Sequence, residues 1–232
     1  PLATMYGADA IGGVVQIFTR SGAGVARVCA TAGAGSRGAR MAEVAVAGGS
    51  NAFSYAFSLA REKDSGFSST KPGLSSYNPD NDGYDKDSAS GRLGVRIADG
   101  IDAGIIYLHS HLNAQYDSGA SGYDTRTVQN LDNIALYSRH QLGRDWQVRL
   151  QVSEAADEST NRTSDSATGS NRIATRQNFY TLQSDLALGP DLLQLIVERR
   201  VEEVISASSA SLARSRATNS VAAAYSARRG AH

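Results

Sequence analysis

An acidic stretch, SSYNPDNDGYDKDS, holds four closely spaced carboxylates, Asp80, Asp82, Asp85 and Asp87. Carboxylates at this density suit a hard cation such as calcium, which prefers oxygen ligands. Acidic loops that are merely solvated have the same composition. An EF-hand loop that begins at Asn78 is excluded because Ala89 stands at its twelfth position, where a bidentate glutamate is required. The residues alone therefore leave both a cation site and a solvated loop open.

Other side chains with catalytic or metal-binding chemistry are sparse. His109 and His111 form an H-x-H pair on one side of an expected strand, but no third metal ligand lies nearby in the sequence. Cys29 is the only cysteine, so neither an internal disulfide nor a cysteine-based metal site can form. No pairing of nucleophile and base is evident, and we predict that the protein is not an enzyme.

Charge and hydropathy narrow the class of protein. The 232 residues include 23 basic and 23 acidic side chains, so there is no excess of positive charge for binding a nucleic acid. No run of eighteen apolar residues occurs, and no transmembrane helix is expected in this stretch. A transmembrane β-barrel is compatible with the composition, because alternating strands carry a much weaker hydropathy signal.

The element that recurs along the chain is a strand with an apolar side and a polar side. In DWQVRLQV, for example, polar residues separate the apolar Trp146, Val148, Leu150 and Val152. Alternation over this length is typical of a β-strand. Ten segments have the pattern, at residues 25–34, 39–48, 52–62, 88–98, 101–112, 127–141, 145–156, 173–188, 191–204 and 216–228.

The connections between these segments differ at their two ends. Tight glycine turns occur at residues 48–51, 98–101, 142–145 and 188–191, whereas polar segments at about 63–87, 113–126, 157–172 and 205–215 join the opposite ends. Short turns at one end and long loops at the other indicate an antiparallel up-and-down sheet of the outer-membrane barrel type. Its polar side, which includes Arg92, Arg96, Arg149 and Glu198, suits a wet or plugged lumen better than a dry core. A soluble β-sandwich or β-solenoid with one solvated face is the alternative.

The segment GAGSRG at residues 33–38 has the G-x-G-x-x-G pattern of dinucleotide-binding sites. Such a site needs a helix directly afterwards and an acidic residue about twenty positions further on. Here the following ARMAEVAVAGG alternates like a strand, and the later FSYAFSLA contains no acidic residue. We interpret these glycines as a loop between the first two strands.

The opening stretch, MYGADAIGGVVQIFTR, carries the most specific signal. Tyr6 to Ile17 resembles the motif that ends the plug domain of TonB-dependent outer-membrane transporters, with Phe18 in place of the usual isoleucine. The resemblance implies that residues 1–20 are the C-terminal end of a plug domain and that residues 21–232 are the N-terminal part of a transmembrane β-barrel. The expected fold is all-β, antiparallel and up-and-down, and the chain is expected to be a fragment of a larger plugged barrel, which in such transporters has about 22 strands.

The resemblance also implies a function, namely active transport across the bacterial outer membrane. Energy would come from the TonB complex acting through a region that precedes this chain, and outer-membrane lipid would surround the barrel. Within the family the order of the loops is most similar to cobalamin receptors, so cobalamin is the expected small-molecule substrate. The alternatives are a siderophore or other nutrient receptor of the same class, and a passive porin or adhesin barrel.

Cobalamin receptors of this family bind calcium between their outer loops. The matching segments here are DNDG at 80–83, YD at 116–117 and DTR at 124–126. The resemblance therefore implies a calcium site formed by Asp80, Asp82, Asp117 and Asp124, with the Tyr116 carbonyl and Asn78 as further ligands. Two departures are evident: Ser68 stands near the position of the family's first aspartate, and the second loop is several residues shorter.

Overall fold

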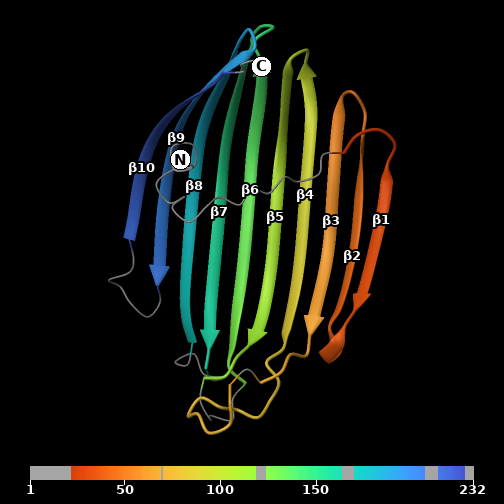
Figure 1. Ribbon diagram of the computed structural model, residues 1–232, viewed down its shortest axis with the longest axis vertical. Coiled ribbons are helices and arrows are strands. Elements are labelled where there is room, and N and C mark those ends of the chain that lie inside the picture. Colours follow the sequence, from red (N-terminus) through yellow and green to blue (C-terminus); the bar gives the residue numbers. More distant parts are fainter. Residues whose placement is uncertain (1–21, 69, 119–123, 164–169, 207–213, 228–232) are drawn as a thin grey trace, which may run out of the picture.

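The computed structural model describes residues 22–68, 70–118, 124–163, 170–206 and 214–227. In these ranges ten strands form one sheet in chain order, each antiparallel to its neighbours (Figure 1). The strands are β1 (Arg27–Ala34), β2 (Arg40–Gly49), β3 (Phe53–Asp64), β4 (Tyr84–Ala98), β5 (Ile101–Gln115), β6 (Arg126–Gln141), β7 (Trp146–Arg162), β8 (Ser170–Leu188), β9 (Asp191–Ser206) and β10 (Arg214–Ser226). The predicted all-β, up-and-down arrangement is confirmed.

The short turns gather at one end of the sheet and the long loops at the other, as predicted (Figure 1). The β4–β5 turn shows how glycine permits such a short connection between two strands. Gly100 adopts a φ of 74°, and the pairing register shifts between Arg96 and Ala98. Glycine adopts this left-handed conformation without the steric cost that a side chain would add. The glycine and the bulge together let two residues connect the strands.

Several strands extend further toward the long loops than the sequence indicated. β4 begins at Tyr84 rather than near residue 88, and β7 continues to Arg162. Asp85 and Asp87 therefore lie on β4 and not in the acidic loop, where they pair with Lys63 at 3.2 Å and Arg61 at 3.6 Å. The β4 strand continues through these polar residues because its backbone N–H and C=O groups still form hydrogen bonds with the neighbouring strands. The sequence does not reveal this part of the strand, because it has no apolar side.

The two faces of the sheet differ in character. Directly paired residues on adjacent strands share a face, so the register assigns each side chain to one side. One face carries many exposed apolar residues, which we call the outer apolar band: Val44, Phe53, Phe57, Leu59, Leu93, Val95, Leu136, Leu150, Val152, Leu182, Val197 and Val221.

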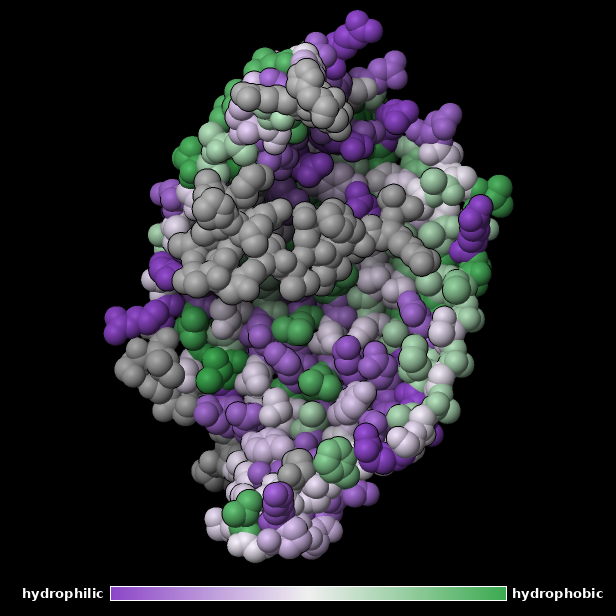
Figure 2. Space-filling view, viewed as in Figure 1, coloured by the Kyte–Doolittle hydropathy of each residue, from purple (hydrophilic) through white to green (hydrophobic). Residues whose placement is uncertain are grey.

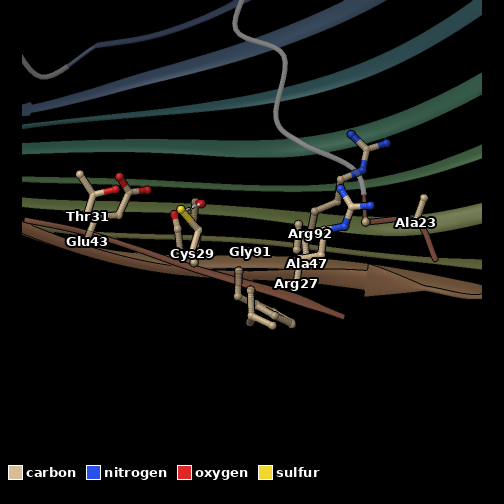
Figure 3. A pocket seen from close by; sticks show the side chains of 15 residues that line it. Ala23, Arg27, Cys29, Thr31, Glu43, Ala47, Gly91 and Arg92 are labelled. Carbon is tan, nitrogen blue, oxygen red and sulfur yellow. Dashed lines mark hydrogen bonds between the residues drawn. The ribbon is translucent and has the colours of Figure 1, made fainter. Parts of the chain in front are cut away.

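The opposite face is concave and carries the charged residues expected in a lumen. Figure 3 shows Arg27, Glu43 and Arg92 projecting from the sheet into the curved space. The hollow of the sheet in Figure 2 shows many hydrophilic residues. Among the described residues the buried apolar core consists of Ala135 alone, which is 6% exposed. A sandwich would bury one whole face, so the soluble-sandwich alternative does not fit this structure.

Two observations bear on the rest of the expected architecture. The predicted plug segment, residues 1–20, lies outside the described residues, and this domain assignment stays a prediction. In the described part of the chain, no helix has the length and apolar character needed to cross a membrane.

Candidate metal centre

Three of the predicted acidic residues come together at the long-loop end of the sheet. Asp80 and Asp82 belong to the connection between β3 and β4, and Asp117 follows β5 directly. One carboxylate oxygen from each lies within 4.8 Å of the other two, and all three residues are half-buried. We refer to Asp80, Asp82 and Asp117 as the acidic trio.

Two carboxylate oxygens of the trio, one on Asp80 and one on Asp117, are available for a cation. Oδ1 of Asp80 and Oδ1 of Asp117 are both buried and have no hydrogen-bond partner. Burial raises the pKa of the Asp80 carboxyl above its ordinary value, a backbone hydrogen bond opposes this, and the neighbouring Asp82, Asp117 and Asp124 add to the rise. Buried acceptors without donors, surrounded by like charge, are the environment that a hard cation stabilises. The residues present therefore fit a calcium ion.

The backbone around Asp82 is held by a close approach at Gly66. This glycine has a φ of 66°, and a Cβ built on it would lie 1.8 Å from the carbonyl oxygen of Asp82. Its N–H donates a hydrogen bond of 2.6 Å to Oδ1 of Asp64, the last residue of β3. A residue with a side chain could not occupy this position without moving the DNDG backbone.

Gln115, the last residue of β5, ties the two loops together. Its N–H donates to the carbonyl of Gly83 at 2.9 Å, and its side-chain Oε1 accepts from the Gly83 N–H at 3.0 Å. Its Nε2 donates to Oδ2 of Asp124. The loop that carries Asp82 and the loop that carries Asp117 and Asp124 are thus joined at the edge of the sheet.

The other predicted ligands lie beside the trio. Asp124 is near enough to contribute to the raised pKa of Asp80, but its Oδ2 accepts a hydrogen bond of 3.1 Å from Arg126. Nδ2 of Asn78 donates to Oδ2 of Asp80 at 2.8 Å. The N–H of Tyr116 donates to the carbonyl of Thr125 at 2.9 Å. Coordination of an ion by any of these six residues stays a prediction.

Sequence reasoning missed the role of Ser68, which it treated only as the place of a missing aspartate. The Ser68 hydroxyl lies 3.1 Å from Oδ2 of Asp117 and 3.2 Å from the carbonyl of Asn78, and its one proton can be donated to either acceptor. It therefore links the two loops next to the trio. No local pattern in the sequence predicts this contact, because Asp117 lies far along the chain.

The two strand histidines are engaged with neighbours on β6. Nδ1 of His109 lies 2.8 Å from Oδ1 of Asp132, and Nδ1 of His111 lies 2.7 Å from Oδ1 of Asn130. In the described residues these side chains do not join the metal-ligating group.

Apart from the acidic trio, a concavity of about 740 Å³ lies on the lumen face between β1 and β4. Arg27, Cys29, Thr31, Glu43 and Arg92 line it and point to the same side (Figure 3). The Arg92 guanidinium lies 5.2 Å from the centre of the Tyr137 ring, and its Nη2 donates to the Tyr137 hydroxyl at 3.2 Å. This wall of the lumen is polar and partly ordered by its own contacts.

Comparison with known proteins relates the chain to bacterial transporters. No family model matches the chain. The chain is 29% identical over 202 residues to the vitamin B12 transporter BtuB of Photobacterium profundum, a match that covers 82% of this chain and 32% of that protein. Among solved structures it is similar to the RagAB peptide importer in its closed-closed state, with a TM-score of 0.49, 8% identity and coverage of 81% of this chain and 29% of that one. The chain thus spans about a third of the length of the curated transporter that it matches.

The up-and-down sheet, its outer apolar band and the sequence match agree on one class of protein: the chain resembles a β-barrel segment of a TonB-dependent transporter. The particular relative that it matches is the vitamin B12 transporter BtuB. This agrees with the prediction from the opening motif and the loop order. The resemblance to cobalamin receptors that the sequence indicated is therefore confirmed. The curated relative is a transporter, in agreement with the prediction that this protein is not an enzyme.

Proposed function

We propose that the full-length protein is a TonB-dependent receptor that imports cobalamin across the bacterial outer membrane. The observation that carries this proposal is the sequence match to a vitamin B12 transporter along 82% of the chain. The outer apolar band supports it, because exposed apolar side chains gathered on one face of the sheet suit a lipid environment.

In this proposal the plug that ends near residue 20 fills the lumen, and the TonB complex acts on it from the inner side. The chain itself then supplies binding and positioning, and no bond is made or broken. The concave wall with Arg92 and Arg149 faces the plug. The long loops, which lie at the opposite end from the tight turns, face the outside and meet the substrate first.

Calcium would be held by the acidic trio, with Asp124, Asn78 and Tyr116 as further candidates. Bound calcium would supply the positive charge that offsets repulsion between carboxylates drawn from two loops. Both loops would then adopt one arrangement. A substrate that binds only this arrangement gains apparent affinity as its population rises.

The test is cobalamin binding by the purified full-length protein, with calcium and with a chelator. Wild type should bind more tightly with calcium. The double variant Asp80→Asn and Asp82→Asn keeps the shape of the loop and removes two charges, so its affinity should no longer depend on calcium. The matched control is Asp85→Asn with Asp87→Asn, since these two aspartates lie on β4 and pair with Lys63 and Arg61. The control should keep the calcium dependence.

The outcomes separate the parts of the proposal. If cobalamin binds equally well with calcium and with chelator, the proposed calcium site is wrong, and the proposed substrate still stands. If wild type does not bind cobalamin but binds an iron–siderophore, the proposed substrate is wrong and the protein is a siderophore receptor of the same class. Cobalamin uptake by cells that lack TonB would favour a passive barrel.

A further inference from the structure

The strands β7 to β10 are neighbours in the sheet (Figure 1). On their outer face the pairing register defines two aligned rows of residues. The first row runs across the four strands as Leu150, Leu182, Val197 and Val221. The second row, one step closer to the long loops, contains Val152, Tyr180, Arg199 and Asn219. Arg199 is thus the one charged residue in the two rows.

Charged residues become frequent beyond Arg199. Glu154, Arg176 and Glu203 lie on the same face closer to the long loops, and Arg176 pairs with Glu154 at 3.7 Å. The row that contains Arg199 therefore marks the border between the outer apolar band and the charged surface on the loop side. In a membrane barrel this border lies at the level of the lipid headgroups.

A shallow groove of about 490 Å³ lies over these two rows. Its side-chain lining on the outer face comes from Leu150, Val152, Tyr180, Leu182, Val197 and Val221, and Arg199 is part of its wall. The surface of the groove is almost wholly apolar, and Arg199 and Asn219 are the polar residues of its outer-face rows. An acyl chain fits such a surface, and a single cation at its loop-side border fits an anionic headgroup.

Arg199 is exposed and forms no ion pair within the described part of the chain. Its neighbours in the register are Tyr180 and Asn219, which carry no charge, and the ion pairs of the described residues do not include it. The adjacent Arg200, in contrast, points to the lumen face and pairs with Glu202. A guanidinium beside apolar surface is stabilised when a phosphate accepts its paired N–H groups.

We propose that Arg199 binds the phosphate of a lipid in the leaflet on the long-loop side, and that the acyl chain of this lipid lies in the groove over β7 to β10. Charge complementarity selects a phosphate lipid, since Arg199 is the one charged side chain in the two outer-face rows that the groove covers. Tyr180 lies beside the headgroup, in the position that aromatic girdles occupy in membrane barrels. The inference rests on the proposed membrane location but not on the proposed substrate.

The test is native mass spectrometry of the full-length protein, delipidated in a neutral detergent and titrated with dimyristoyl phosphatidic acid or with dimyristoyl glycerol. The two probes share their acyl chains and differ in the phosphate. Wild type should bind the first phosphatidic acid more tightly than the first diacylglycerol. Arg199→Gln should weaken phosphatidic acid binding by about tenfold, the size of one charged hydrogen-bonding contact. Arg199→Lys keeps the charge but loses the paired donors, so its affinity for phosphatidic acid should lie between those of wild type and Arg199→Gln.

Arg149→Gln is the matched control, because Arg149 lies on the lumen face of neighbouring β7. It should bind phosphatidic acid as wild type does. The proposal is overturned if wild type does not distinguish the two lipids, if Arg199→Gln binds as wild type does, or if Arg149→Gln loses as much affinity as Arg199→Gln. Cobalamin binding by Arg199→Gln should be unchanged. Failure of wild type to bind cobalamin would overturn the proposed function and leave the lipid result standing.

Discussion

The hydroxyl of Ser68 donates toward Oδ2 of Asp117 across 3.1 Å, although the two residues belong to different loops. The same hydroxyl lies 3.2 Å from the carbonyl of Asn78, whose side chain contacts Asp80. Ser68 therefore occupies the space beside the acidic trio where another ligand could stand. Its contribution is a neutral dipole rather than a charge.

Replacing Ser68 by aspartate should convert this dipole into one more carboxylate beside the acidic trio. Calcium affinity should then rise on the order of tenfold, because affinity in oxygen-ligand sites increases with the number of charged ligands. Ser68→Ala should instead weaken binding a few-fold, through loss of one hydrogen bond of roughly 1 kcal/mol. Calorimetric titration of calcium into the full-length protein measures both effects, and equal affinity for Ser68→Asp and wild type would show that Ser68 does not lie next to the ion.

Gly66→Ala should damage the calcium site without removing any charge. The new Cβ would collide with the carbonyl of Asp82 at 1.8 Å, and the φ of 66° adds strain. Gly73→Ala is the matched control, because Gly73 also has a positive φ, of 94°, but has open space around it. We expect weaker calcium binding for Gly66→Ala and near wild-type binding for Gly73→Ala, measured in the same titration. Similar losses in the two variants would indicate that backbone strain alone, not the approach to Asp82, sets the site.

Leu150→Arg and Arg149→Val test the assignment of the two faces. Leu150 is exposed on the outer apolar band, and an arginine near the bilayer midplane costs ~2–4 kcal/mol. We expect the amount of Leu150→Arg in the outer membrane to fall, whereas Arg149→Val should insert normally and change plug contacts or transport. Membrane fractionation, with the mobility of unheated samples in electrophoresis as a measure of folding, gives the result. Normal insertion of Leu150→Arg would mean that the faces are reversed.

The 232-residue chain by itself should not be a stable monomer in water. β1 and β10 are the outer strands of the described sheet, and unpaired strand edges are templates for association. Large apolar side chains such as Phe57 at 43% and Leu59 at 67% exposure also require lipid or detergent. Size-exclusion chromatography should show aggregates without detergent. A monodisperse, cooperatively melting sample would contradict this expectation and argue for a soluble fold.

The strands could be predicted from the sequence wherever one side belongs to the outer apolar band. Along β7, Trp146 to Val152 alternate cleanly because the outer residues must be apolar and the lumen residues need not be. The same rule fails at Asp85 and Asp87, where polar residues of the loop-side surface continue the ladder of β4 without an apolar signal. Sequence reasoning therefore located the ten strands of the described sheet and misplaced several of their ends.

The candidate site was predictable only in part. The DNDG segment marks Asp80 and Asp82 as a pair, because their spacing is local. The approach of Asp117 depends on how two loops meet, and the family resemblance rather than any spacing supplied it. The contacts of Gln115 with Gly83 arise from the register of the folded sheet. Such contacts leave no trace in a single sequence.

The positions of Asp82 and Asp117 have a topological consequence. Asp82 lies just before β4 and Asp117 just after β5, and the two strands are joined at their far end by the turn at Gly100. An ion shared by these two carboxylates turns the hairpin into a closed ring, fastened covalently at one end and by coordination at the other. Fraying of either strand from the loop side then requires release of the ion, so the metal acts as a reversible cross-link. Proteolytic nicking near residue 82 should accordingly be slowed by calcium to the same extent as nicking near residue 117.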